Sequence, residues 1–303
     1  MIDRLAMFMV LARTEHFGRA AEELGITQPS LSSALKALED QLGVQLVRRG
    51  SRYRGLTPEG ERVLDWARRI VGDARSMREE INALRHGLSG QLRIAAIPTA
   101  LPMVAALTTP YRERHPNVRF TIYSRTSIEV LDLLGNLEID AGITYLANEP
   151  LGHVTAVPLY RERYRLLTSA DAPLGNRQSV TWAEVAQVPL CLLTPDMQNR
   201  RIIDRLLQSA GAESRPTLES DSMILLYSHV RTGRWASVMP AKLAETLGLT
   251  DVIRAIPITE PEAVQTIGLV APAREPMMPN TAALVEEARR LAPTLDAAVR
   301  EPQ

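Results

Sequence analysis

The chain has 303 residues, and its 35 basic and 35 acidic side chains leave a formal net charge of zero. This length predicts two or three domains with a substantial core, and the 45% hydrophobic and 23% charged content is ordinary for a globular protein. A balanced charge means that any affinity for nucleic acid must come from a local cluster of basic residues. The single cysteine, Cys191, excludes an intramolecular disulfide and a cysteine-rich metal site.

The first segment, residues 1–13, predicts an amphipathic helix. Its charged residues, Asp3, Arg4 and Arg13, leave an apolar run too short for a membrane span and unlike a signal peptide. We therefore expect a cytoplasmic protein with no membrane contact.

Residues 17–42 carry the pattern of a helix-turn-helix. The apolar positions of its first helix recur at helical spacing: Phe17, Ala20, Ala21 and Leu24. Gly25 breaks that helix, and Thr27 can cap a second helix over 28–41, with Pro29 in its first turn. The second helix has a buried stripe at Leu31, Leu35, Leu38 and Leu42. Its size fits the major groove of DNA.

The opposite face of this second helix is polar and carries a single charge. The amide of Gln28 can donate to and accept from adenine, and Pro29 offers an apolar face to a thymine methyl group. The remaining candidates can reach bases or phosphates. The predicted DNA-binding residues of the helix are Thr27, Gln28, Pro29, Ser30, Ser32, Ser33 and Lys36. Taken alone, such residues could equally be a solvated helix face.

A basic turn follows the helix. Residues 45–47 and 54–56 can pair as two strands of a wing, and the turn between them is rich in arginine and free of acids. Several phosphate contacts would make DNA binding steeply dependent on salt. The candidates for these contacts are Arg48, Arg49, Arg52 and Arg54. A solvated turn is the alternative.

Thr57-Pro58-Glu59 predicts the start of a long helix that ends before the glycines of residues 87–90. Its apolar positions alternate steps of four and three: Val63, Ala67, Ile70, Ala74, Met77, Ile81 and Leu84. That spacing favours a left-handed pairing with a second helix, although packing on the chain's own core is possible.

After residue 90 the pattern is of the α/β class. We predict strands at 91–97, 118–124 and 140–145 alternating with helices at 101–114 and 127–135, hence a parallel sheet. A strand pair near 154–168 leads into a second unit with strands at 188–193 and 236–240 and helices near 196–210 and 221–232. The strand at 263–271 and the helix at 281–299 are expected to return to the first.

The order and spacing of four motifs resemble the LysR-type transcriptional regulators. The motifs are F-x-x-A-A-x-x-L at 17–24, TQPSLS at 27–32, LE-x-x-LG at 38–43, and the run from Arg49 through Leu56, Thr57 and Gly60. The resemblance implies an α/β protein with a mainly α winged helix-turn-helix at 1–57, a dimerisation helix at 58–86 and a hinge at 87–90. It implies a two-lobed effector domain, similar to periplasmic binding proteins, at 91–303, with lobe I at 91–160 and 264–303 and lobe II at 161–263.

Helix starts in this domain predict an effector site. Free N–H groups at helix N-termini favour an anion, so two such ends with hydroxyls would suit a carboxylate or another oxyanion. The resemblance implies the same positions. The candidates are Thr99, Ala100, Thr126, Ser127, Thr144, Gln198, Asn199, Arg200 and Ser222. Simple helix capping is the alternative for the hydroxyls, and surface exposure for the arginine. Trp235 could narrow this pocket or pack under the second sheet.

We therefore interpret the chain as a regulator that binds a promoter inverted repeat as a dimer, assembles into a tetramer and responds to a small molecule. RNA polymerase is a possible further partner. We expect no cofactor, metal or catalytic residue, and no enzyme activity, because no nucleophile elbow, phosphate loop or metal-ligand spacing occurs. An enzyme or solute-binding protein, and a DNA-architectural protein that binds no ligand, are the two alternatives.

Overall fold

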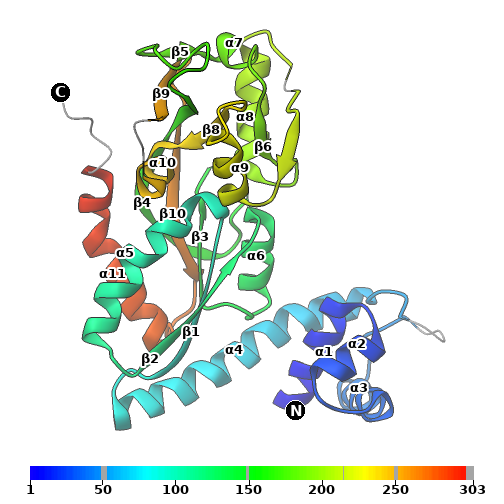
Figure 1. Cartoon of the computed structure of the whole chain (residues 1–303). Helices are drawn as coiled ribbons and strands as arrows, with labels where there is room; N and C mark the ends of the chain where they lie inside the picture. The colour runs from blue at the N-terminus through cyan, green and yellow to red at the C-terminus, as the bar shows by residue number, and fades with distance from the viewer. Residues whose placement is uncertain (49–52, 148–149, 214, 249–251, 298–303) are drawn as a thin grey trace. The chain divides into compact units, whose positions relative to one another are not determined.

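The computed structural model describes residues 1–48, 53–147, 150–213, 215–248 and 252–297 (Figure 1). Its internal contacts divide the chain into two compact units. The first comprises Met1–Leu88 together with two short later segments, Gly135–Glu138 and Arg274–Pro279. The second comprises the rest of the chain from Ser89 onward.

The first unit contains four helices among the residues described: α1 (Ile2–Thr14), α2 (Phe17–Glu23), α3 (Gln28–Leu42) and α4 (Pro58–His86). Each lies within about two residues of its predicted range because local signals set its ends. The Thr27 hydroxyl accepts from the backbone N–H of Ser30 at 3.3 Å, and the Thr57 hydroxyl accepts from that of Gly60 at 2.9 Å. The cap of α2, the ring of His16, was not anticipated.

The predicted wing is smaller than expected. In place of two paired strands, the described residues form one isolated antiparallel bridge, between Val47 and Leu56. Glu39 on α3 holds the first of these segments, because its carboxylate accepts from the backbone N–H groups of Leu46 at 2.8 Å and Val47 at 3.3 Å. Backbone groups that could extend a ladder are thus bound to a side chain instead.

The core of the first unit follows the predicted stripe of α3 with one correction. Leu31, Leu35 and Leu38 are buried together with Ala20 of α2. Leu42 was placed in the same stripe but is 39% exposed. It is the last residue of α3, and the chain turns away at Gly43 directly after it.

The predicted seam of α4 has two halves. Ala67 is fully buried, and Val63 and Ile70 pack against the core of the first unit. Further along, Met77 is 56% and Leu84 82% exposed. The helix therefore presents an apolar stripe to solvent over its second half.

The second unit begins as predicted. The strands β1 (Gly90–Ala96), β2 (Val118–Ser124) and β3 (Ala141–Tyr145) alternate with the 3-10 turn η1 (Pro98–Ala100) and the helices α5 (Leu101–Arg114) and α6 (Ser127–Gly135). Strand β1 pairs in parallel with both β2 and β3. The carboxyl ends of these strands therefore meet at one edge, where η1 and α6 start.

The next prediction, a strand pair near 154–168, is wrong. Residues 154–169 form one long strand, β4 (Val154–Ser169), with Pro158 beside a bulge in its pairing. It pairs antiparallel with β10 (Val264–Pro272), which also pairs antiparallel with β3, so the sheet is mixed and not parallel throughout. In Figure 1 the orange β10 lies between them, and the strand order is β2-β1-β3-β10-β4-β9-β5 with β8 beside β4.

The other elements complete the second unit. The strands are β5 (Val180–Thr181), β6 (Cys191–Leu193), β7 (Leu218–Ser220), β8 (Ser237–Pro240) and β9 (Ile253–Thr259). The helices are α7 (Trp182–Val185), α8 (Gln198–Ser209), α9 (Met223–Val230), α10 (Ala241–Leu247) and α11 (Pro279–Ala297). Strand β6 pairs in parallel with β7. Within the described ranges, no helix is both long and apolar enough to span a bilayer.

Candidate functional site

The polar face of α3 is exposed along its length. Gln28, Pro29, Ser32, Ser33 and Lys36 all lie on the surface. Thr27 and Ser30 are exposed too, but their hydroxyls bind each other at 2.8 Å while Thr27 caps the helix. The arrangement offers a row of short uncharged donors and acceptors on a rigid helix, which is the surface that reading base edges requires.

Two of the four predicted wing arginines lie within the described residues. Arg48 and Arg54 are exposed, and the Nε of Arg48 donates to the carbonyl of Leu56 at 3.1 Å. That bond anchors the side chain at the bridge. Arg49 and Arg52 lie outside the described residues.

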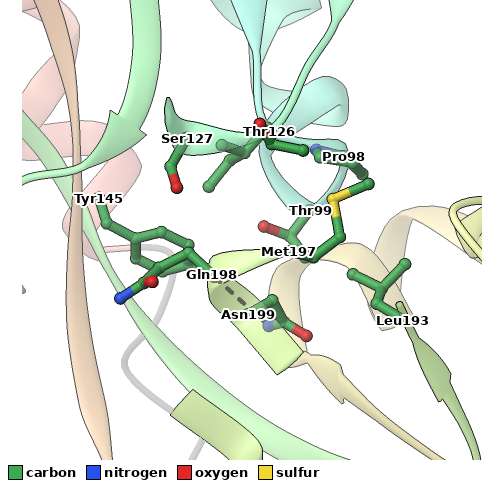
Figure 2. Close-up of a pocket in the computed structure, with 10 residues that line it drawn as sticks. Pro98, Thr99, Thr126, Ser127, Tyr145, Leu193, Met197, Gln198 and Asn199 are labelled. Carbon is green, nitrogen blue, oxygen red and sulfur yellow. Dashed lines mark hydrogen bonds between the residues drawn. The ribbon is translucent and has the colours of Figure 1, made fainter. Parts of the chain in front are cut away.

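Five of the predicted effector residues come together around one small pocket in the second unit (Figure 2). They are Thr99, Thr126, Ser127, Gln198 and Asn199. The apolar part of the lining consists of Ile97, Pro98, Leu193 and Met197. The free volume is about 10 Å³, which is room for about one water molecule.

Helix starts position these side chains. Thr126 and Glu129 form a reciprocal cap at the start of α6, because the Glu129 N–H donates to the Thr126 hydroxyl at 3.2 Å and the Thr126 N–H donates to the carboxylate at 2.8 Å. The start of α8 differs, since Met197 provides no side-chain cap. Its first turn therefore leaves N–H groups available near the pocket.

The other four predicted effector residues do not line this pocket. Ala100 is buried at the start of α5, and Thr144 is buried within β3. Ser222 caps α9. The guanidinium of Arg200 is held by Asp204 at 2.7 Å and Glu219 at 2.6 Å, so its charge is already compensated by neighbours on α8 and β7.

Sequence reasoning missed Tyr145, which lines the pocket, and Glu162, which Tyr145 contacts. The hydroxyl of Tyr145 donates to Glu162 at 2.9 Å while accepting from the Asn199 amide at 3.3 Å. Burial raises the pKa of Glu162 to about 7, although the Tyr145 hydroxyl opposes the rise. The alternation of Tyr160, Glu162 and Tyr164 with arginines is the strand signal that marks Glu162 as inward-facing.

The single thiol lies elsewhere. Cys191 on β6 is fully buried and donates to the carbonyls of Leu226 at 3.6 Å and Ala236 at 3.5 Å. Burial raises the pKa of its thiol to about 11. This side chain is therefore a neutral part of the core at physiological pH.

Comparison with known proteins agrees with this architecture. Residues 2–61 match the bacterial regulatory helix-turn-helix proteins of the lysR family, and residues 85–293 match the LysR substrate binding domain. The DNA-binding transcriptional dual regulator OxyR of Escherichia coli (strain K12) is 28% identical over 289 residues, which cover 95% of this chain and 94% of the relative. A hydrogen peroxide-inducible genes activator of Dickeya chrysanthemi is 27% identical over 270 residues, which cover 89% of this chain and 88% of the relative.

Solved structures agree as well. A full-length OxyR variant from Pseudomonas aeruginosa has a TM-score of 0.75 at 26% identity, with 100% of this chain and 98% of that chain covered. CbnR, solved in complex with its target DNA, has a TM-score of 0.60 at 22% identity. The match covers 96% of this chain and 100% of that chain, and it shows a likeness of fold alone.

A helix-turn-helix domain over residues 2–61 followed by a LysR substrate binding domain over residues 85–293 defines a DNA-binding transcription regulator with an effector-binding domain. The chain belongs to the LysR family of bacterial transcriptional regulators.

Proposed function

We propose that this regulator reads a promoter inverted repeat through α3 and is controlled by a small polar metabolite that widens the pocket at Thr99 and Asn199 as it binds. The observation that carries the first part is the row of short polar side chains exposed on α3. Gln28 would bind an adenine, Pro29 a thymine methyl, and the serines and Lys36 nearby bases or phosphates. Arg48, Arg49, Arg52 and Arg54 would bind phosphates.

The exposed apolar stripe of α4 supports an inverted repeat as the DNA site. Met77, Ile81 and Leu84 are exposed at heptad spacing, and water is an unfavourable neighbour for such a stripe. A second copy of α4 would cover it, and the resulting two-fold symmetry would place two α3 helices on two half-sites. Further pairing of dimers would give the tetramer, and contact with RNA polymerase would transmit the response.

The pocket in the second unit supports the second part of the proposal. Thr99, Ser127 and Asn199 are buried and line this pocket with hydroxyl and amide groups, and buried polar groups favour a polar partner. A ligand would supply one. The uncapped start of α8 favours an oxyanion such as a carboxylate, whereas ionised Glu162 behind Tyr145 would repel it, so binding of an anion would be coupled to protonation of Glu162.

Peroxide is the alternative effector, because the relative from Dickeya chrysanthemi is named a hydrogen peroxide-inducible genes activator. Peroxide reacts with an accessible thiolate, and a disulfide switch within one chain needs a second cysteine. Here the lone thiol is buried and its pKa is raised to about 11. We therefore favour a non-covalent effector over peroxide for this chain.

The DNA part is tested with the fragment upstream of the protein's own gene. Gln28→Ala should cost about 1–3 kcal/mol of binding at one base pair while leaving affinity for random DNA almost unchanged. Fluorescence anisotropy on both DNAs measures the difference. Asp40→Ala, an exposed residue further along α3, is the control. Equal losses by Gln28→Ala on both DNAs, or no binding of the fragment by the wild type, would contradict the proposal.

A further inference from the structure

The second unit holds another cavity that the proposed function does not use. Its free volume is about 300 Å³, at the lower end of the range of about 300–1,000 Å³ that small-molecule sites occupy. Three loops form it: one follows β4, one follows α7 and one precedes β8. The walls are largely apolar and include Pro173, Leu174, Val188, Pro189 and Trp235.

Trp235 provides the aromatic wall. Its ring is half-buried, packs on the core beneath the cavity and meets the ring of His229 edge to face, with centroids 5.8 Å apart. The residue does not line the pocket at Thr99, so it leaves the size of that pocket unchanged. An aromatic surface held by a second ring is well suited to stack against a flat ligand.

The polar rim of the cavity has an excess of positive charge. Arg234 is exposed, and no carboxylate in the described part of the chain pairs with it. The other charged residue of the rim, Glu184, is already bound: it accepts from the Thr181 N–H at 2.8 Å and from Arg177 at 2.5 Å. The rim therefore offers one uncompensated guanidinium, which suits one carboxylate.

We infer that this cavity is a second small-molecule site, specific for a flat aromatic monocarboxylate whose ring lies against Trp235 and whose carboxylate binds Arg234. The volume of about 300 Å³ suits a ligand of one or two rings, and a carboxylate would pair with the exposed guanidinium. This site is separate from the effector pocket and goes beyond the proposed function.

The backbone links the two sites. Pro189 in the cavity wall accepts a hydrogen bond from the Ala236 N–H at 2.9 Å, and the Cys191 N–H donates to the Ala236 carbonyl at 2.9 Å. An occupant would therefore contact the chain that enters β6. The far end of β6, at Leu193, lines the effector pocket. A ligand in the cavity is thus positioned to change the effector pocket through one short strand.

The test uses the full-length protein and two probes of equal shape, 1-naphthoate and 1-naphthamide. Calorimetric titration should give one saturable site that binds the carboxylate about tenfold more tightly than the amide, because the charged group gains a charge-assisted hydrogen bond. Arg234→Gln should abolish that tenfold preference. Arg231→Gln, an exposed arginine outside the cavity, is the matched control and should keep it.

A second variant fills the cavity. Val188 is half-buried in its wall, and Val188→Trp should eliminate binding of both probes while the melting temperature shows that the chain is folded. If that variant does not fold, the surface variant Arg234→Gln decides alone. The inference is overturned if the wild type binds neither probe saturably, or if Arg234→Gln binds naphthoate as tightly as the wild type does.

Discussion

The polar face of α3 and the pocket at Thr99 contain the same chemistry in opposite surroundings. Both consist of threonine, serine, glutamine or asparagine side chains near a helix start. On α3, Gln28 and Ser33 are exposed. In the pocket, Thr99, Ser127 and Asn199 are buried.

This difference separates two ways of recognising a partner. Exposed side chains on α3 are hydrogen-bonded to water and need no partner inside the fold. The spacing of these residues along one helix is therefore enough to define the surface. Buried side chains have already lost their water, and each needs a partner inside the fold or in the ligand. The pocket should therefore depend on its neighbours, such as Glu162 and Tyr145, far more than the α3 face does.

The largest expected effect concerns Glu162. The folded chain keeps its carboxyl proton up to about pH 7, whereas the carboxyl of the unfolded chain loses it near 4.5. The stabilisation is fully present below the lower value and is lost as pH rises through the higher one. The free energy of unfolding should therefore fall by an amount on the order of 3 kcal/mol over this window from this group. Urea titrations between about pH 4 and pH 8 measure the fall.

Glu162→Gln is the decisive comparison, because its neutral side chain cannot lose a proton. The difference in stability between wild type and variant should change across the window and level off above it. Tyr145→Phe removes the hydroxyl that opposes the rise, so it should move the loss of stability to higher pH. A wild type and Gln variant with parallel pH profiles would show that folding does not raise the pKa of this carboxyl and would weaken the contrast between the two surfaces.

Local and long-range interactions also differ in how far the sequence could predict the structure that they produce. Helix ends are set by residues close in sequence, so Thr27 and Thr57 were read correctly as caps of α3 and α4. Long-range pairing leaves no such local mark. Strand β4 was divided into two, and the bulge beside Pro158 that lets it continue is formed in pairing with β10, more than a hundred residues later.

The pocket at Thr99 was anticipated only where a helix start marks it. Thr99, Thr126 and Gln198 stand next to such starts, and the structure brings them together. Tyr145 lies at the end of a strand and Glu162 in the middle of one, where a polar residue reads as an outward side chain unless the alternation along the strand is followed. Arg200 looked available because its partner Glu219 lies on another element.

An intermediate effect concerns the support of the α3 face. Gly60 lies in α4, where alanine would ordinarily stabilise the helix. A Cβ at this position would lie 2.1 Å from the carbonyl oxygen of Leu46, in the backbone that Glu39 holds against α3. Gly60→Ala should therefore destabilise the first unit by about 2 kcal/mol and weaken binding to all DNA sequences alike.

Thermal unfolding and anisotropy measure the two consequences of Gly60→Ala. The control is Gly135→Ala at the end of α6, where a new Cβ meets nothing within 4 Å and stability should be unchanged or slightly higher. If Gly60→Ala were as stable as the wild type, the close approach would not be rigid, and the exposed face of α3 would not need this support.

The smallest expected effect is the response to peroxide. Because Cys191 is buried and its pKa is raised to about 11, millimolar hydrogen peroxide should leave the affinity for the promoter fragment unchanged in the wild type and in Cys191→Ala alike. The variant loses only a small buried side chain, so its stability should fall by about 1 kcal/mol. Alkylation by iodoacetamide should be slow in the folded chain and fast in urea, which checks burial separately. A peroxide effect present in the wild type and absent from Cys191→Ala would mean that β6 opens to solvent, and the buried interior of the effector domain would then be chemically as accessible as the α3 face.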